Sequence, residues 1–472
     1  MSEGWAAIEL QDLDLGDARR TRRLIQTVET LALAPQASVP VACGDWATTK
    51  AVYRFWSNPA VDPAAIRAAH AASAVRRMAE VDTVLVVQDT TELDFTTRQA
   101  MAGRGKLGSG VGRGVYVHSG LAVSTSGTPL GIVHQQSWIR DPQAPRSRQT
   151  RRQRATADKE SQRWLTGLTL GEGVVPAEIA VVMIADREAD IFDLFAQERR
   201  PASDWLVRAT HDRAVEVDAP AREPTTLVAH LAQAPVAGQI TVSVPRGRGR
   251  PEREATLAVR YRAVTLRPPR SRPKREGLQP VPVWAVLAEE VAVPDGVTPL
   301  RWMLLTSLAV TRLADALRCV AWYRLRWLIE RYHYVLKEGC RVEELQLESV
   351  ERLERALATY CIVSWRVLWV SILARQTPDA SCELILAEHE WQALACGVRK
   401  TTIPPTEPPT LRQAVRWIGQ LGGFLGRTGD GEPGVKVLWR GMQKLEGMVQ
   451  MWVLLKGIDP HASHSGGLLG NG

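Results

Sequence analysis

The first 75 residues carry apolar positions at helical spacing. Residues 12–33 open with acids and continue with leucine, isoleucine and valine three and four positions apart, beside four arginines in the second turn. Asp45 can cap a second helix over residues 46–57, which ends before Asn58-Pro59. This pattern predicts a small helical N-terminal unit with a basic face.

From residue 83 the apolar positions change to the runs of β-strands. Three such runs follow one another with short links, which predicts an antiparallel meander: TVLVVQDTTELDF, VYVHSGLAVSTSG and LGIVHQQSWIR. A helix over residues 159–170 and a buried strand, EIAVVMIADREAD, come next. A short helix and the strand DWLVRAT complete the series. Strands that alternate with helices in this way indicate an α/β fold.

A β-rich segment interrupts this rhythm between about residues 213 and 300. Three runs there alternate like antiparallel strands and are separated by basic loops: QITVSVP, ATLAVRYRAVTLRPP and PVWAVLAEEVAV. A strand, WMLLTSLAV, and a long helix over about residues 311–339 follow. The rest of the chain has helical spacing. We therefore expect three domains: residues 1–75, residues 76–375 with the β-rich insertion, and residues 376–472.

Polar residues mark one face of the segment YRLRWLIERYHYVLK, at residues 323–337. Four of them share a face if the segment is one helix: Tyr323, Arg326, Glu330 and Lys337. This face holds one carboxylate among cations. An ordinary solvated face would give the same pattern, because Arg326 and Glu330 form a common i, i+4 pair.

The charge balance favours an acidic partner. Lysine and arginine total 59 against 51 acidic residues, which gives a net charge of +8. Arginines gather at residues 19–23, 140–154 and 246–275. Such clusters suit a polyanion, although solvated loops rich in arginine would look the same. The chain starts without the basic and apolar regions of a signal peptide, so we expect a cytoplasmic protein without a membrane partner.

Two aspartates follow apolar strand runs, Asp89 in VVQDTT and Asp186 in MIADRE. If the two strands are neighbours, both carboxylates meet at the sheet rim, and Glu330 can add a third from a helix across the sheet. Converging carboxylates need cations between them, and oxygen-only ligands suit two Mg²⁺ or Mn²⁺ ions that assist phosphoryl transfer. Each aspartate could instead be a turn or cap residue, and Asp94 is a rival to Asp89.

The order strand-Asp, strand-Asp, helix-Glu, with a meander between the first two, is the layout of an RNase H-like nucleotidyl-transfer core. Residues 323–337 also resemble the Y-R-E-K signature of the Tn-five-like DDE transposases of the IS-four family. Five further segments resemble that family's two aspartate segments, the two strands between them and its DNA-binding region: QDTTELDF, ADREADIFDLF, GRGVYVHSGLAV, GTPLGIVHQQSWIR and WATTKAVYRFWSNP. The resemblance extends to about residue 370. It implies an RNase H-like α/β core with a β-rich insertion, flanked by helical domains.

The resemblance implies a cut-and-paste transposase in which Asp89, Asp186 and Glu330 hold two Mg²⁺ ions. In such enzymes water attacks at the transposon end and frees a 3′-hydroxyl, which attacks the opposite strand to form a hairpin. The hairpin is reopened, and the 3′-ends join target DNA. The implied partners are the inverted-repeat ends, the target DNA and a second subunit, and the implied location is the bacterial cytoplasm, at the nucleoid.

The family likeness also implies DNA contacts. Tyr323, Arg326 and Lys337 would contact phosphates near a flipped nucleotide. Trp302 matches the family's stacking tryptophan, and Arg208 matches a DNA-contacting arginine. Trp302 could instead be a core residue of its strand.

The chain departs from the family at one point, because His333 and Tyr334 stand where a further basic residue is expected. The C-terminal helices, with apolar faces that carry tryptophans, are by resemblance the meeting place of two subunits in a synaptic complex. A helical cap on the same subunit would explain these faces as well.

Two other functions remain open at this point. An RNase H-like nuclease without strand transfer would use the same three carboxylates, although the basic N-terminal helices and Trp302 argue against it. A non-catalytic DNA-binding relative would keep the helical N-terminal domain, although the intact carboxylates argue against that.

Overall fold

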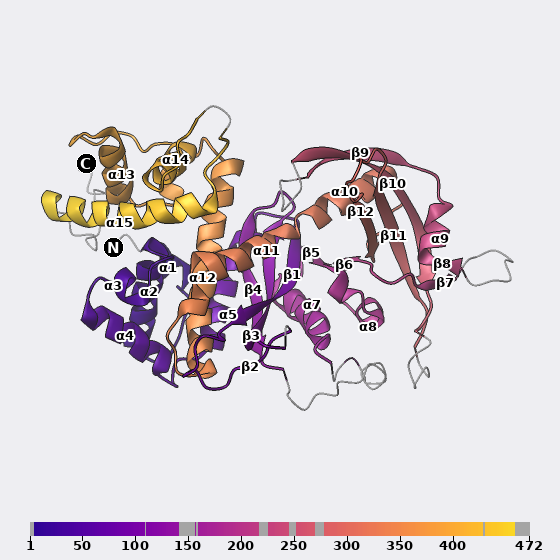
Figure 1. The fold of residues 1–472 in the computed structure, drawn as a ribbon, viewed down its shortest axis with the longest axis horizontal. Helices are drawn as coiled ribbons and strands as arrows, with labels where there is room; N and C mark the ends of the chain where they lie inside the picture. Colours follow the sequence, from indigo (N-terminus) through magenta and orange to yellow (C-terminus); the bar gives the residue numbers. More distant parts are fainter. Residues whose placement is uncertain are drawn as a thin grey trace, which may run out of the picture.

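One mixed β-sheet connects most of the chain in the computed structural model (Figure 1). The structure describes residues 4–108, 110–140, 156, 159–216, 225–244, 252–269, 278–427 and 430–457. Within these residues the sheet has twelve strands in the order β2-β3-β1-β5-β6-β12-β11-β10-β7-β8, with β4 beside β3 and β9 beside β10.

The first half of the sheet has β1 at its centre. This strand pairs antiparallel with β3 and parallel with β5, which pairs parallel with β6, and β4 continues the meander on β3. A meander joined to two parallel strands is the arrangement expected of an RNase H-like core. The strands are β1 (Thr83–Asp94), β2 (Gly105–Lys106), β3 (Arg113–Ser124), β4 (Pro129–Trp138), β5 (Ala180–Ala185) and β6 (Ser203–Arg208).

Helices cover both faces of this half, because successive residues of a strand point to opposite sides. Val84 and Val86 pack in one cluster with Ala74 of α5 (Pro63–Met78), and Gly171 of α7 (Gln162–Val174) also approaches Val86. The alternate residues of β1 pack on the other side against α11 (Trp327–Tyr334) and α12 (Val350–Gln376). The side chain of Asp89 shares this second face.

The β-rich segment extends the same sheet. Strand β12 pairs with β6, where Leu304 lies opposite Arg208, and β11 and β10 follow as long antiparallel strands. A second apolar cluster lies between these strands and α7, α8 and α9. The elements are α8 (Phe192–Ala196), β7 (Ala214–Glu216), β8 (Thr225–Thr226), α9 (Leu227–Ala232), β9 (Gly238–Val244), β10 (Arg253–Leu266), β11 (Val281–Glu290) and β12 (Arg301–Thr306).

The prediction of one continuous helix over residues 311–339 is wrong, because the structure divides this segment into two α-helices and a π-helical turn. Helix α10 (Leu313–Arg324) is joined to α11 by a tighter turn with i→i+3 hydrogen bonds, including Arg326 N–H to the Tyr323 carbonyl at 3.0 Å. A π-helical turn, Val335–Gly339, follows α11. A Cβ on Gly339 would lie 2.4 Å from the Trp439 ring, so the absence of a side chain at Gly339 lets Trp439 of a distant helix approach closely. The four polar residues therefore do not form one straight stripe.

The two ends of the chain form helical groups at one side of the sheet (Figure 1). Asp45 caps α4 as predicted, since its Oδ1 accepts from Thr48 N–H at 2.8 Å. Helix α2 begins at Ala18, after the Asp17 cap, and not at residue 12. The helices are α1 (Trp5–Glu9), α2 (Ala18–Leu33), α3 (Val39–Cys43), α4 (Trp46–Ser57), α13 (Glu388–Arg399), α14 (Leu411–Leu421) and α15 (Val435–Lys456).

Helix α12 runs through the centre of the molecule and packs on α2, α5 and β4. By length and composition it could cross a membrane, but 89% of its most apolar window is buried inside the protein. Its apolar character is therefore that of a core helix, and it ends beyond the domain boundary predicted at residue 375.

Candidate active site

Asp89 and Asp186 lie at the same level on adjacent parallel strands. The register of β1 and β5 pairs Val87 with Ile184, and each aspartate lies two residues further along its strand. Asp186 directly follows β5. Asp89 does not end a strand as predicted, because β1 continues to Asp94 through its pairing with β3. The rival Asp94 binds Thr96 N–H and hydroxyl instead, at the far end of β1.

Arg326 joins Asp89 to Glu330. Glu330 lies on α11, which packs against β1 and β3. The Arg326 Nη1 atom is 3.5 Å from Asp89 Oδ2, and its Nη2 atom donates to Glu330 Oε1. One guanidinium thus lies between two of the three predicted carboxylates.

The three carboxylates are close enough to influence one another. Burial, the largest cause, and the negative charges of Asp186 and Glu330 together raise the pKa of Asp89 to about 7. The Thr90 N–H, 2.7 Å from Asp89 Oδ1, and the Arg326 guanidinium act in the opposite direction. A pKa perturbed by burial and specific charges is typical of functional sites.

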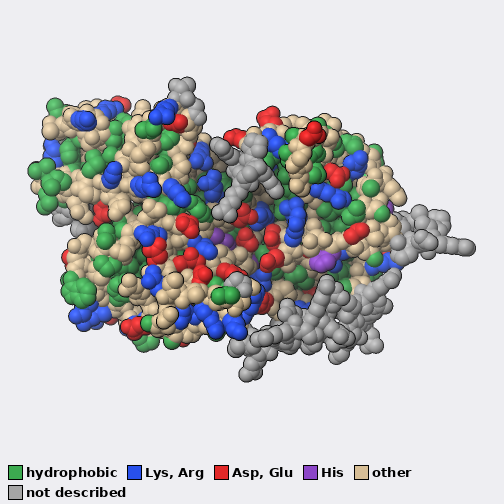
Figure 2. All heavy atoms as spheres, viewed as in Figure 1, with side chains coloured by type: hydrophobic (Ala, Val, Ile, Leu, Met, Phe, Trp, Pro, Cys, Tyr) green, Lys and Arg blue, Asp and Glu red, His purple; other side chains and the backbone are tan. Residues whose placement is uncertain are grey.

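The donor set of this site suits a hard divalent cation. Within the described part of the chain, no three His, Cys, Asp or Glu side chains are grouped closely enough to hold a metal ion, and Arg326 is the cation beside Asp89 and Glu330. Oxygen-only ligands prefer Mg²⁺ or Mn²⁺. The chemistry of these donors therefore fits such an ion, whereas their spacing in this structure is wider than a bound ion requires. Figure 2 shows acidic side chains gathered near the middle of one face, with basic side chains around them.

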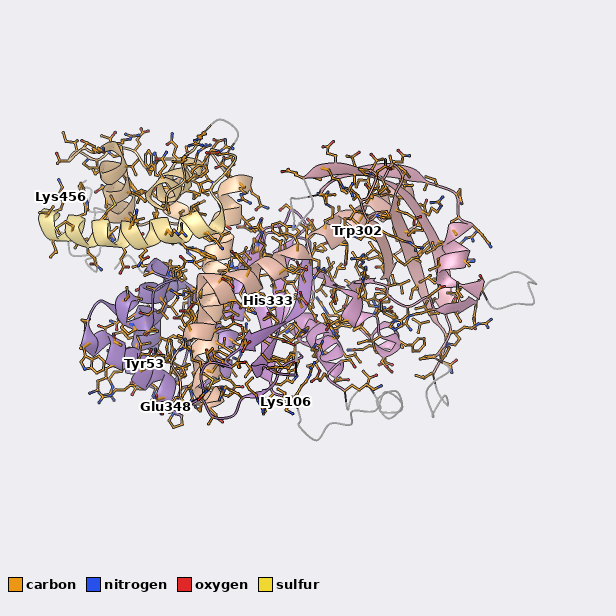
Figure 3. All side chains as sticks on the ribbon, in the orientation of Figure 1. Tyr53, Lys106, Trp302, His333, Glu348 and Lys456 are labelled. Atoms are coloured by element: carbon orange, nitrogen blue, oxygen red, sulfur yellow. The ribbon has the colours of Figure 1, made fainter. Side chains whose placement is uncertain are left out.

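Tyr323, Trp302 and Arg208 form a group beside the carboxylates. The rings of Trp302, on β12, and Tyr323, on α10, meet edge to face with centroids 5.9 Å apart. Arg208 hydrogen-bonds the Tyr323 side chain and donates to the Arg301 carbonyl at 2.9 Å. Tyr323 is buried, whereas Trp302 and Arg208 are half-buried. Figure 3 shows Trp302 on the β-rich side of α11.

Lys337 lies apart from the three carboxylates. Its Nζ atom donates to the Glu92 carbonyl at 2.9 Å and lies 3.2 Å from Glu343 Oε1. Glu92 is three residues beyond Asp89 on β1. The π-helical turn thus directs Lys337 along the strand and away from Glu330.

The two residues that depart from the family pattern, His333 and Tyr334, pack against other parts of the protein. His333 is buried on α11 (Figure 3), and burial and the charge of Lys337 lower its pKa to about 3, so it is neutral. Tyr334 stacks on Trp439 of α15, with ring centroids 6.0 Å apart. Tyr334 thus links the helix of Glu330 to the C-terminal helices.

Two ionic contacts near the site gave no signal in the sequence. Asp190 is buried and accepts hydrogen bonds from the backbone of Thr210 and His211 and from Arg213. Arg163 of α7 contacts the segments that follow both aspartates. The sequence gave no signal for this role of Arg163, since the role depends on contacts between segments that are far apart in the sequence.

Three family descriptions match this chain along most of its length. "Transposase DNA-binding" matches residues 2–61, "Transposase DDE domain" matches 135–366 and "Transposase Tn5 dimerisation domain" matches 362–454. The chain belongs to the Tn5-like DDE transposases of the IS-four family. The predicted RNase H-like fold class is thereby confirmed. Asp186 and Glu330 lie within the matched DDE residues, and Asp89 lies between the first two matched segments.

One solved structure aligns with this transposase along most of both chains. A cryo-EM structure of the piggyBac transposase synaptic complex with hairpin DNA aligns with 97% of this chain and 78% of its own, at 8% identity and a TM-score of 0.33. This likeness is too low to support an argument. The matched families assign the transposase a DNA-binding region, a DDE catalytic domain and a dimerisation domain.

Proposed function

We propose that this transposase moves its element by a cut-and-paste reaction at the site of Asp89, Asp186 and Glu330. The observation that carries the proposal is the arrangement of these acids. The two aspartates each lie two residues beyond the last registered pair of the parallel strands β1 and β5, and Arg326 joins Asp89 to a glutamate on a helix packed against β1. Acids drawn together from three separate segments support phosphoryl transfer.

The proposed reaction is a series of displacements at phosphorus. Water attacks the phosphodiester at the transposon end, and the leaving group is the 3′-oxygen of the element. This 3′-hydroxyl attacks the opposite strand to give a hairpin, water reopens the hairpin, and the 3′-hydroxyl then attacks target DNA. One site suffices, because each step exchanges one oxygen on a phosphodiester for another.

Asp89, Asp186 and Glu330 are the residues that would hold Mg²⁺ or Mn²⁺, two ions per site. Such ions would supply Lewis acidity for the attacking and leaving oxygens. The pKa of Asp89 is raised mainly by burial and further by the charges of Asp186 and Glu330, which supports this assignment because it places the three acids close together. Arg326 neutralises Asp89 and Glu330 in the absence of an ion, and its donors suit a DNA phosphate once a metal takes over that role.

The group around Tyr323 would hold the bent DNA end. Arg208 and Arg326 are cations beside the phenol, and both suit phosphate oxygens. Trp302 is half-buried and meets Tyr323 through an edge-to-face contact, which supports a role in stacking a flipped base. Lys337 lies near Glu92 of β1, so it would contact a DNA phosphate further from the three acids.

The proposed partners are the inverted-repeat ends of the element, target DNA and a second copy of the chain. The dimerisation-domain match supports pairing of two subunits, with each end cut only in the paired complex. The basic net charge supports a DNA partner. We place this reaction at the bacterial nucleoid, in the cytoplasm.

A cleavage assay with a labelled duplex that bears the element's end tests the proposal. With Mg²⁺ we expect nicks, then hairpins, then products joined to target DNA. Glu330→Ala should abolish all of them and leave end binding intact, whereas Glu338→Ala, an exposed acid eight residues along, should leave them unchanged.

Other results would lead to different conclusions. Nicking at random positions without hairpins would identify a nuclease. Binding without cleavage by the unaltered protein would identify a non-catalytic relative, and cleavage that persists in Glu330→Ala would remove Glu330 from the site.

A further inference from the structure

Arg163 lies beneath the two aspartates, on the sheet face opposite Glu330. It belongs to α7, and its side chain is only 14% exposed. Its Nε atom donates to Thr90 Oγ1 at 2.8 Å, and its Nη2 atom donates to Glu188 Oε2. Its Nη1 atom donates to the Glu160 carbonyl at 2.8 Å, so each nitrogen of the guanidinium has a partner.

Both side-chain partners of Arg163, Thr90 and Glu188, also hydrogen-bond the catalytic aspartates through their backbone N–H groups. Thr90 follows Asp89, and its backbone N–H donates to Asp89 Oδ1 at 2.7 Å. Glu188 lies two residues after Asp186, and its backbone N–H donates to Asp186 Oδ1 at 2.8 Å. Arg163 thus connects β1 and the turn after β5 through the residues that orient the two carboxylates.

The guanidinium is fixed in direction by its surroundings. It lies over two indole rings, 5.6 Å from the centroid of Trp138 and 5.4 Å from that of Trp164. Trp164 is fully buried and meets His118 edge to face, with centroids 4.7 Å apart. A planar guanidinium packed against two rings has little freedom to rotate, so its hydrogen bonds can hold Thr90 and Glu188 at a fixed separation.

The Thr90 hydroxyl connects Arg163 to His118 on β3. His118 Nδ1 is 3.0 Å from Thr90 Oγ1, and its Nε2 atom is 3.1 Å from Gln88 Oε1. The Thr90 hydroxyl accepts from Arg163 Nε and lies within hydrogen-bond distance of His118 Nδ1, so it is held from both sides.

We infer that Arg163 is a positioning residue that sets the separation of the Asp89 and Asp186 carboxylates, through Thr90 and Glu188, for binding of the divalent metal ions. The inference rests on the proposed function of the two aspartates. Residues that orient metal ligands typically change metal affinity or activity about 10- to 100-fold when they are altered. Arg163 touches neither DNA nor metal in this role and acts only through its two partners.

The test compares variants at Arg163 with a matched arginine. Arg163→Gln removes the bridge, and Arg163→Lys keeps the charge but has a single donor group that cannot serve both partners. Arg200→Gln is the control, since Arg200 is also half-buried and binds two carbonyls, those of Pro176 and Ile179, at the other end of β5. Thr90→Val and Glu188→Gln each weaken one arm of the bridge.

Metal binding and catalysis are measured separately. Mn²⁺ affinity is determined by electron paramagnetic resonance on the full-length protein bound to a pre-cleaved end, where no turnover occurs. Single-turnover nicking is measured against Mg²⁺ concentration, and end binding by gel shift. For Arg163→Gln we expect Mn²⁺ affinity and nicking at low Mg²⁺ to fall about 10- to 100-fold with end binding within about 2-fold of wild type.

The other conditions and variants are compared with Arg163→Gln in nicking rate and metal affinity. High Mg²⁺ should restore part of the nicking rate of Arg163→Gln, Arg163→Lys should lie between it and wild type, and Arg200→Gln should keep wild-type metal affinity. Adding Thr90→Val to Arg163→Gln should cause little further loss, because both changes break the same arm.

Several outcomes would overturn the inference. Unchanged Mn²⁺ affinity and Mg²⁺ dependence in Arg163→Gln would do so, as would a loss of end binding and thermal stability without a change in metal affinity, which would indicate a purely structural residue. If Asp89→Asn and Asp186→Asn still nick DNA, the proposed function itself fails. If they are inactive while Arg163→Gln behaves as wild type, only the inference about Arg163 fails.

Discussion

The guanidinium of Arg326 lies 3.5 Å from the carboxylate of Asp89, although the two residues come from distant parts of the chain. The turn between α10 and α11 places Arg326 at the first position before α11, with Glu330 one helical turn further on. Arg326 can therefore neutralise a strand acid and a helix acid at once. This pairing reduces the repulsion between the Asp89 and Glu330 carboxylates while no metal ion is bound.

Replacement of Arg326 should impair catalysis more than DNA binding. For Arg326→Ala we expect the rate of nicking to fall about 100-fold, because a fixed cation beside developing phosphate charge is lost. Arg326→Lys should recover little, since an ammonium cannot contact both acids as a guanidinium does. Single-turnover cleavage and gel shift measure the two effects. Arg331→Ala, on the outer side of α11 against Trp327, is the control, and an equal loss in this variant would contradict the prediction.

Gly339 should not accept a side chain. A Cβ there would lie 2.4 Å from the Trp439 ring, and Trp439 is fully buried, so Gly339→Ala should lower the free energy of unfolding by about 1–3 kcal/mol. Gly173→Ala in α7 is the matched control. Nothing lies within 4 Å of a Cβ at Gly173, and alanine in a helix should stabilise the protein by about 0.5–1 kcal/mol. Urea unfolding measures both changes, and equal effects of the two would show that Trp439 does not limit the π-helical turn.

Stability at low pH should depend on Glu9. This buried acid binds His70 Nδ1 at 2.6 Å and both terminal nitrogens of Arg77, at 2.8 and 3.0 Å. Burial alone would raise its pKa, but His70 and Arg77 hold the pKa at about 2, below the value of 4.5 expected when the chain is unfolded. Ionised Glu9 therefore contributes stability above pH 4.5, of order 3 kcal/mol, which is lost as pH falls from about 4.5 to about 2.

The thermal midpoints of wild type and Glu9→Gln, compared from pH 7 to pH 3, test this dependence. The difference between the two proteins should be largest at pH 6–7 and should shrink toward pH 3. The exposed acid Glu348 provides the control variant, Glu348→Gln, which should change little at any pH. A difference for Glu9→Gln that stays constant with pH would show that ionisation of Glu9 does not stabilise the fold.

Trp302 should matter most for the hairpin step. Trp302→Ala is expected to reduce hairpin yield about 10-fold with a smaller effect on the first nick, because a stacked base is worth about 1–3 kcal/mol. Trp302→Phe should restore most of the yield. Trp284→Ala, a half-buried tryptophan on the neighbouring strand β11, controls for loss of sheet packing. Equal losses of nick and hairpin in Trp302→Ala would indicate that the ring only supports Tyr323.

The spacing of apolar residues along the chain determined the kind and order of most elements. The meander, the buried strand before Asp186 and the cap at Asp45 could be predicted because period-2 and period-3.6 patterns and capping residues are local signals. The spacing also indicates that Asp89 and Asp186 follow strand residues and that Glu330 belongs to a helix, but the choice of these three acids as one site rests on their order along the chain and on the family resemblance.

Tertiary contacts decided the features that local patterns cannot contain. The Trp439 ring against Gly339 accompanies the π-helical turn that directs Lys337 toward Glu92 and away from Glu330. The pairing of β1 with β3 beyond Asp89 placed that residue within a strand. Arg163 acquired its contacts only when α7 packed beneath β1 and the turn after β5, because hydrogen bonds between distant segments depend on how elements pack and leave no periodic trace in the sequence.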